Sequence, residues 1–197
     1  MRKSIFILAI SLLLPIVCCA QGRFEGYKKK AEQGNARSQY NLGLCYAIGE
    51  GVAKDYKQAV YWWKKSAEQG FVEAQFNLGC CYNKGEGVAK DPKQATYWFK
   101  KAAEQGLADA QFNLGLCYSN GNGVTKDEKQ AVYWWKKAAE QGFVEAQYNL
   151  GACYRDGKGV TKDEKEAVYW YRKAADQGNE TAKWALRILE DKIRRQK

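Results

Sequence analysis

Residues 107–142 read LADAQFNLGLCYSNGNGVTKDEKQAVYWWKKAAEQG, and most of the chain repeats this pattern. Three more copies lie end to end with it, at residues 35–70, 71–106 and 143–178. The copies at 35–70 and 107–142 are identical at 26 of 36 positions. A fixed period of this length is typical of solenoids, in which each unit buries its apolar face against its neighbours.

Each copy contains two amphipathic helices, which we call helix A and helix B in chain order. In the copy at 71–106, Ala74, Leu78 and Cys81 recur at helical spacing in helix A, which a Gly-x-Gly turn ends. Asp91 is placed to cap helix B. We expect the buried side of that helix to be Ala95, Trp98, Phe99 and Ala102. The pattern therefore predicts an all-α solenoid, an α/α superhelix of helix–turn–helix units.

Two further features of the repeat predict tight packing. A glycine in the middle of helix A recurs in every copy, as Gly43, Gly79, Gly115 and Gly151. Glycine costs about 1 kcal/mol against alanine there, so we expect close backbone approach by a neighbouring helix. The aromatic runs at 61–63 and 133–135 lie within helix B, and we interpret them as core packing rather than as a sugar or base platform.

The sequence pattern resembles a known repeat family. The residues A-x-x-x-L-G-x-x-Y-x-x-G-x-G-V-x-x-D-x-x-x-A-x-x-W, followed by K-A-A-x-x-G, are similar to the Sel1-like repeat, a relative of the tetratricopeptide repeat with a longer loop between its helices. The resemblance covers residues 34–178 without a gap. It implies a binding scaffold, but it names no partner, because such solenoids bind unrelated proteins.

Half-repeats flank the four copies. Residues 21–34 match the second half of a repeat and predict a starting helix for the first copy. Residues 179–197 match only a first half, in which Ala182 and Leu186 keep the core positions. Arg187 stands where every full copy has a glycine, as expected of a capping helix on which no further helix packs.

The first twenty residues, 1–20, resemble a secretory signal peptide. Basic residues at 2–3, an apolar run at 5–17 and small residues before Gln21 predict cleavage at that point. Thirteen apolar residues are too few to span a bilayer, so we expect no stable membrane insertion after cleavage. The mature protein would be periplasmic or secreted by a bacterium. Lipoprotein anchoring through Cys18 or Cys19 is the alternative.

The net charge of +10 is concentrated at the two ends of the chain, at 23–30 and 183–197. We interpret these basic residues as solvated helix ends. An acidic envelope surface or nucleic acid is the alternative contact. Export argues against nucleic acid, which is not expected as a partner.

The residue inventory predicts no enzyme. The chain has no histidine, the commonest general base and metal ligand. Aspartates recur every 36 residues, but each is expected to cap a helix B: Asp55, Asp91, Asp127 and Asp163. We therefore expect no catalytic residue, no metal site and no cofactor.

The cysteines are expected to be structural. Four occupy one repeat position, as Cys45, Cys81, Cys117 and Cys153. Equivalent positions of stacked repeats lie about 10 Å apart, beyond the roughly 7 Å that a disulfide tolerates, so we expect buried, unpaired thiols. Cys80 is expected to face the other side of helix A and to be the most reactive. Some Sel1-like proteins have two bridged cysteines per repeat and a link to β-lactamase activity, but helix B lacks the second cysteine here.

The surface of helix A away from the apolar stripe is the candidate binding surface. By resemblance to tetratricopeptide repeats, it lines a concave groove, with an aromatic row and an asparagine row that can bond a ligand's backbone or carboxylate. The predicted partner-binding residues are Tyr40, Asn41, Phe76, Asn77, Cys80, Asn83, Lys84, Phe112, Asn113, Leu116, Ser119, Tyr148, Asn149 and Arg155. Alternatively, variation at these positions is drift after duplication, and the asparagines make local helix contacts.

These observations predict an exported, non-catalytic, monomeric scaffold that binds a protein or peptide in its groove. Two alternatives remain open at this stage. One is a β-lactamase-like hydrolase, by distant family analogy. The other is an assembly factor for envelope polysaccharide or peptidoglycan.

Overall fold

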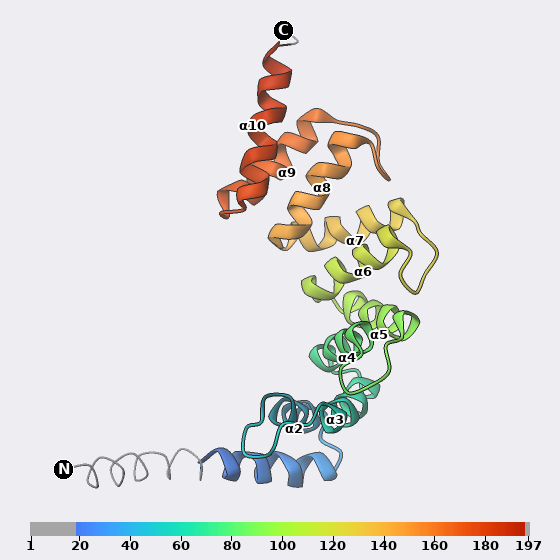
Figure 1. The fold of residues 1–197 in the computed structure, drawn as a ribbon, viewed down its shortest axis with the longest axis vertical. Coiled ribbons are helices and arrows are strands. Elements are labelled where there is room, and N and C mark those ends of the chain that lie inside the picture. The colour runs from blue at the N-terminus through green and yellow to red at the C-terminus, as the bar shows by residue number, and fades with distance from the viewer. Residues whose placement is uncertain (1–18, 196–197) are drawn as a thin grey trace, which may run out of the picture. The chain divides into compact units, whose positions relative to one another are not determined.

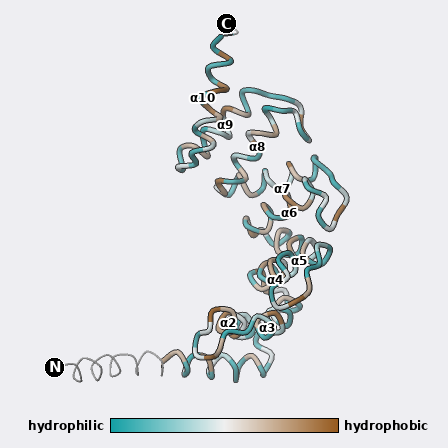
Figure 2. The backbone as a smooth tube through the Cα atoms, in the orientation of Figure 1, coloured by the Kyte–Doolittle hydropathy of each residue, from teal (hydrophilic) through white to brown (hydrophobic). Residues whose placement is uncertain are grey.

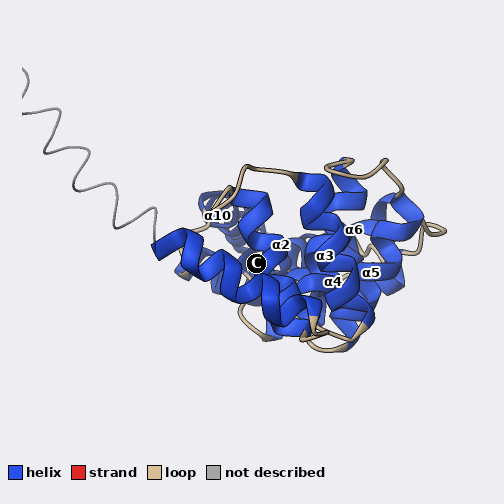
Figure 3. Ribbon diagram, turned by 90° about the horizontal axis from the view of Figure 1, so that it is seen from below, coloured by secondary structure: helices blue, strands red, loops and turns tan. Residues whose placement is uncertain are grey.

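The computed structural model describes residues 19–195, so residues 1–18 of the predicted signal peptide lie outside the described range. Within that range the chain consists of helices and loops, without a strand (Figures 1 and 3). It divides into two compact units at the Asp91–Pro92 bond. After its starting helix, the first unit contains a helix A, a helix B and a helix A in chain order. The second unit contains helices B, A, B, A and B, followed by the last helix.

The first unit contains a helix at 19–32, then α2 (Ala36–Ile48), α3 (Tyr56–Glu68) and α4 (Val72–Lys84). The second contains α5 (Pro92–Glu104), α6 (Ala108–Asn120), α7 (Glu128–Glu140), α8 (Val144–Asp156), α9 (Glu164–Asp176) and α10 (Glu180–Arg195). Consecutive helices within each unit pack on one another, as α2 does on α3 and α6 on α7. The predicted all-α solenoid class is confirmed.

The helix ends follow the predicted chemistry. Asp55 accepts hydrogen bonds from the backbone N–H groups of Lys57 (2.8 Å) and Gln58 (3.1 Å), and Asp127 and Asp163 cap α7 and α9 in the same way. Helix A ends at a left-handed glycine, such as Gly49 with φ 82°, whose N–H donates to the Cys45 carbonyl. Such a φ is favourable only for glycine. The recurring aspartates at 55, 127 and 163 are therefore structural caps.

The mid-helix glycine accommodates an aromatic ring from helix B of the same repeat. A Cβ at Gly43 would lie 2.5 Å from the Trp63 indole, and one at Gly151 would lie 2.7 Å from the Tyr171 ring. In the first repeat the Trp63 indole N–H also donates to the Tyr40 carbonyl at 3.2 Å. The prediction of a close approach is confirmed, but the approaching group is a side chain rather than a helix backbone.

The aromatic runs of helix B divide between the core and the surface. Trp62 and Trp63 are buried, as predicted, whereas Tyr61 is 49% exposed. The prediction of core packing is therefore wrong for the tyrosines, because three consecutive helical residues cannot all face one side. The Tyr61 ring contacts the edge of Trp62 with centroids 5.0 Å apart, and the Lys65 ammonium lies 4.9 Å from its centroid. The same exposed tyrosine recurs as Tyr97, Tyr133 and Tyr169.

A buried glutamine connects each helix A to the helix B before it. The Gln111 side-chain amide donates to the Ala103 carbonyl at the end of α5, at 3.2 Å. Gln141, at the end of α7, donates to the Gln111 side-chain oxygen at 2.8 Å. One side chain thus joins three successive helices. Equivalent bonds to the preceding helix are made by Gln39, Gln75 and Gln147.

The last helix caps the array only in part. Ala182 is buried as predicted, whereas Leu186 is half-buried and Leu189, one turn further on, is buried. Exposed Arg187 stands where helix A of the preceding repeat has Gly151, so the close approach of a ring seen at that glycine does not recur on α10. Glu190 accepts a hydrogen bond from Arg172 of α9. These polar contacts hold α10 on α9.

Apolar and polar residues alternate along the helices (Figure 2). No helix among the described residues is long and apolar enough to cross a membrane.

The glycine–ring contact predicts a cost for adding one methyl group. We expect Gly115→Ala to lower the free energy of unfolding by ~2 kcal/mol or more, although alanine favours helix, because the methyl would overlap the Trp135 indole. Urea unfolding of residues 21–197 measures this. Adding Trp135→Phe, the residue type at 99 in the second repeat, should recover part of the loss. Equal losses in the single and double variants would contradict the ring as the cause.

The glutamine bridge predicts a second cost. We expect Gln111→Leu to lower the free energy of unfolding by ~2 kcal/mol, because the Ala103 carbonyl and the Gln141 amide lose their shared partner. The matched control is Gln130→Leu, at an exposed position of α7, for which we expect a change within ~0.5 kcal/mol. Similar midpoints for the two variants in urea would show that the bridge adds no stability.

Candidate functional site on the surface of helices A

The predicted aromatic row takes part in packing between helices. The Tyr40 ring lies 5.0 Å from that of Phe71, the first residue of the next repeat, and Phe112 stacks on Phe143 at the same distance. Both Tyr40 and Phe112 are half-buried. Their exposed edges can still contact a partner, but much of each ring stabilises the stacking of repeats.

The asparagine row does not act as one uniform ladder. Asn113 donates from its side chain to the Asp109 carbonyl one turn earlier, at 2.7 Å, which is a local helix contact. Asn77 is hydrogen-bonded to the Tyr40 hydroxyl. Burial raises the pKa of Tyr40, and the charge of Glu73 raises it further. The hydrogen bond from Asn77 offsets part of this rise. Asn41 and Asn149 instead line clefts.

A cleft of about 270 Å³ lies between helices A of the third and fourth repeats. Ser119 and Asn120 at the end of α6 form one wall, and Asn149, Ala152 and Asp156 of α8 form the other. Lys126 and Glu128 of the loop and α7 close one end, 3.1 Å apart as an ion pair. The lining is mainly polar, so the cleft can accept a peptide's backbone and polar side chains.

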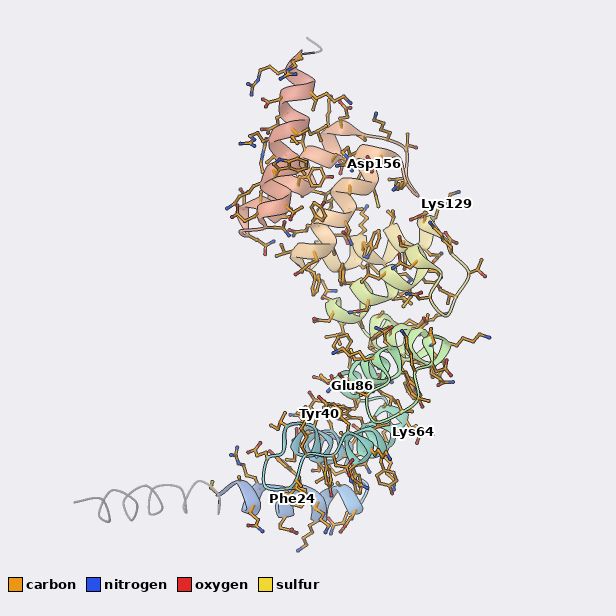
Figure 4. All side chains as sticks on the ribbon, in the orientation of Figure 1. Phe24, Tyr40, Lys64, Glu86, Lys129 and Asp156 are labelled. Carbon is orange, nitrogen blue, oxygen red and sulfur yellow. The ribbon has the colours of Figure 1, made fainter. Side chains whose placement is uncertain are left out.

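Arg155 and Asp156 form a charged edge at the end of α8 (Asp156 is labelled in Figure 4). The Arg155 guanidinium donates twice to the Asp156 carboxylate, at 2.7 and 2.9 Å. These bonds hold the pKa of Asp156 below its usual range. The carboxylate therefore stays ionised at neutral pH.

Arg155 also lines a second, smaller cleft of about 170 Å³ against α10. Trp184 and Ile188 lie there, and they are 58% and 46% exposed. The sequence prediction missed both residues. Trp184 follows Tyr148 by 36 positions and is the fifth member of the aromatic row, so extending the period into 179–197 would have found it.

A third cleft, of about 450 Å³, lies in the first unit between the helix at 19–32 and α2. Arg23, Lys30 and Arg37 bring three cations to it, and Tyr27 and Asn41 line it as well. Of the predicted site residues, only Asn41 belongs to this cleft.

The remaining predicted residues differ in exposure. Asn83 and Lys84 are exposed at the end of α4, whereas Phe76 and Cys80 are half-buried on the same helix. Leu116 is half-buried and packs on the core of the second unit. Asn83 and Lys84 are thus the exposed members of the predicted set, and both lie at the C-terminal end of α4.

The recurring cysteines are buried free thiols, as predicted: Cys45, Cys81, Cys117 and Cys153. Burial raises the pKa of Cys81 to about 12 and that of Cys153 to about 11, so both are protonated at neutral pH. The described residues contain no group of three or more His, Cys, Asp or Glu side chains placed to hold a metal ion.

Comparisons with known proteins identify the family of the repeat. The family model for the Sel1 repeat matches residues 36–71, 72–107, 108–143 and 144–179. The comparison with curated proteins gave no match.

Solved structures of other proteins are similar to the chain, among them the following three. A protective antigen of uropathogenic Escherichia coli strains with an SLR fold is 46% identical over 81% of this chain, with a TM-score of 0.78. A Sel1 repeat protein from Oxalobacter formigenes is 42% identical over 81%, with a TM-score of 0.76. The chain spans 34% and 65% of those two proteins. Helicobacter pylori cysteine rich protein B is 30% identical over 68% of this chain and 96% of its own, with a TM-score of 0.53.

Thiol accessibility gives a direct test of the buried cysteines. At pH 8 we expect a maleimide to modify Cys80 in folded residues 21–197 before the four buried thiols. A pKa of about 11 leaves Cys153 with about a hundredfold less thiolate than an ordinary cysteine. Mass spectrometry of the labelled peptides measures the order, and Cys80→Ser should remove the fast phase. Early labelling of Cys81 or Cys153 in the folded protein would contradict their burial.

Proposed function

Because the chain belongs to the Sel1 repeat family, we propose that it is an exported, non-catalytic scaffold that binds a protein or peptide on the surface of its helices A. The family supplies the scaffold fold. Export is proposed from the sequence of residues 1–20, and the resemblance to a protective antigen supports it. The peptide partner is proposed from the surface described above.

The observation that carries this proposal is the cleft between α6 and α8. Its walls include the last two residues of α6, Ser119 and Asn120, and the last residue of α8, Asp156. These two positions differ in every copy: Ala47 and Ile48, Asn83 and Lys84, Ser119 and Asn120, Arg155 and Asp156. Each repeat thus presents a different pair of side chains at the end of its helix A, as a specific partner requires.

The geometry favours an extended segment over a small molecule. The cleft is lined by amide, hydroxyl and charged groups and has few apolar walls, whereas small-molecule sites are mostly apolar. An extended chain presents backbone N–H and C=O groups at regular intervals, which Asn149 and Asn120 can pair with. Apolar anchors are available on α10, where Trp184 and Ile188 are exposed.

Site-specific photocrosslinking tests the proposed surface. A photoreactive benzoylphenylalanine is placed at Ser119, on the cleft, and in a second protein at Lys136, on the exposed side of α7. We expect cells that make the protein to give a discrete crosslinked product from position 119 and none from position 136, because the partner contacts helices A. Circular dichroism must first show equal helicity for both proteins. The same product from position 136, or from 136 alone, would move the site to helices B.

A further inference from the structure

The first repeat carries a charge that the other repeats reverse. Helix A begins with an acidic residue at its second position in the later copies, as Glu73, Asp109 and Glu145. The first copy has Arg37 at that position, and its first turn contains no acid. Helix N-termini favour negative charge, so Arg37 occupies a position where the helix dipole disfavours it. Such a local conflict needs another explanation, and functional contacts are the usual one.

Arg37 lines the cleft of about 450 Å³ between the helix at 19–32 and α2. Its guanidinium lies 6.0 Å from the centre of the Phe71 ring, beside the Tyr40 ring of the aromatic row. Arg23 and Lys30 line the same cleft from the neighbouring helix. Within residues 19–195, Glu50 is the only carboxylate that forms an ion pair with any of these three cations; it lies 2.6 Å from Arg23. The described cleft therefore keeps a positive excess.

The polar lining suits a negatively charged group of defined shape. Asn41 and Tyr27 are half-buried in the cleft and offer an amide and a hydroxyl beside the cations. Carboxylates accept hydrogen bonds from guanidinium, ammonium and amide groups together. A positive cleft also speeds the encounter with a negatively charged partner. The site is continuous with helix A of the first repeat, which carries the proposed peptide surface.

We propose that this cleft binds carboxylate groups of an acidic segment in the protein or peptide partner. This inference rests on the proposed function, because it names the chemistry of the partner at the first repeat. Arg37 is the residue that makes the first repeat different from the others, and Lys30 and Arg23 complete the cation set. The acids at the same register in the later repeats would disfavour the same segment there, and they fix it to the first copy.

Fluorescence anisotropy with labelled peptides tests the inference on residues 21–197. One probe is hexaglutamate with an amidated C-terminus, and a second is hexaalanine with a free C-terminus, so that side-chain and main-chain carboxylates are distinguished. Hexalysine is the control. We expect hexaglutamate to bind saturably and more tightly than hexaalanine, hexalysine not to bind, and the affinity for hexaglutamate to fall as NaCl rises from 50 to 300 mM.

Arg37→Glu is the decisive variant, because it installs the residue type that repeats two and four carry at this register. We expect at least a fivefold weaker affinity for the carboxylate probe together with an equal or higher melting temperature. The matched control, Lys136→Glu, changes the net charge equally on α7 and should change the affinity less than twofold. Lys30→Gln, on the helix at 19–32, should also weaken binding.

Three results would overturn the inference: no saturable binding of hexaglutamate, even if hexaalanine binds; binding that Arg37→Glu leaves unchanged; or equal losses in Arg37→Glu and Lys136→Glu. A crosslinked product from Ser119 together with any of these would leave the proposed peptide surface standing and remove only the acidic segment. Saturable, Arg37-dependent binding without that product would support the cleft and contradict the α6–α8 surface.

Discussion

The buried glutamine of helix A is the contact on which the stacking of repeats depends. It spans three successive helices, because its amide binds the carbonyl end of the preceding helix B while its oxygen accepts from the end of its own helix B, as at Gln111. The hydrogen bonds between Gln111, Gln141 and the Ala103 carbonyl can all form only when the three helices keep one register. An unpaired amide in this position would carry a desolvation cost comparable to a lost hydrogen bond. The repeat is therefore fixed by polar bonds inside an apolar core, with the ring on the mid-helix glycine filling the space beside them.

Much of this architecture follows from period and pattern alone. The caps at Asp55, Asp127 and Asp163, the burial of the four recurring cysteines and the tight contact at Gly43 are all visible in the sequence. The buried glutamines are equally invariant among the copies, yet a polar residue in helix A gives no sign of facing the core. The tyrosine of helix B also misleads, because hydrophobicity does not tell which of three adjacent aromatic residues faces solvent.

The binding surface is less predictable because its residues serve two purposes. Tyr40 and Phe112 join an aromatic row in the sequence, but in the structure they pack on the first residue of the next repeat. The Asn113 side-chain amide donates to the Asp109 carbonyl of its own helix. The side chains that remain available to a partner are set by three-dimensional packing. They lie at the ends of helices A, in the cleft between the helix at 19–32 and α2, and in the cleft against α10. The ends of the array also differ most from the repeat pattern, through Arg37 in the first copy and Trp184 in the last helix. Positions at which one copy differs from the shared repeat pattern are where specificity for a partner is expected.

The central claim is that helices A, and not helices B, carry the binding surface. Amide hydrogen exchange of residues 21–197, with and without a purified partner, tests it most directly. The account predicts slower exchange in α6 and α8, concentrated toward residues 117–120 and 153–156, with α7 and α9 unchanged. Slower exchange confined to α7 and α9 would contradict it and would place the partner on the exposed tyrosines of helix B.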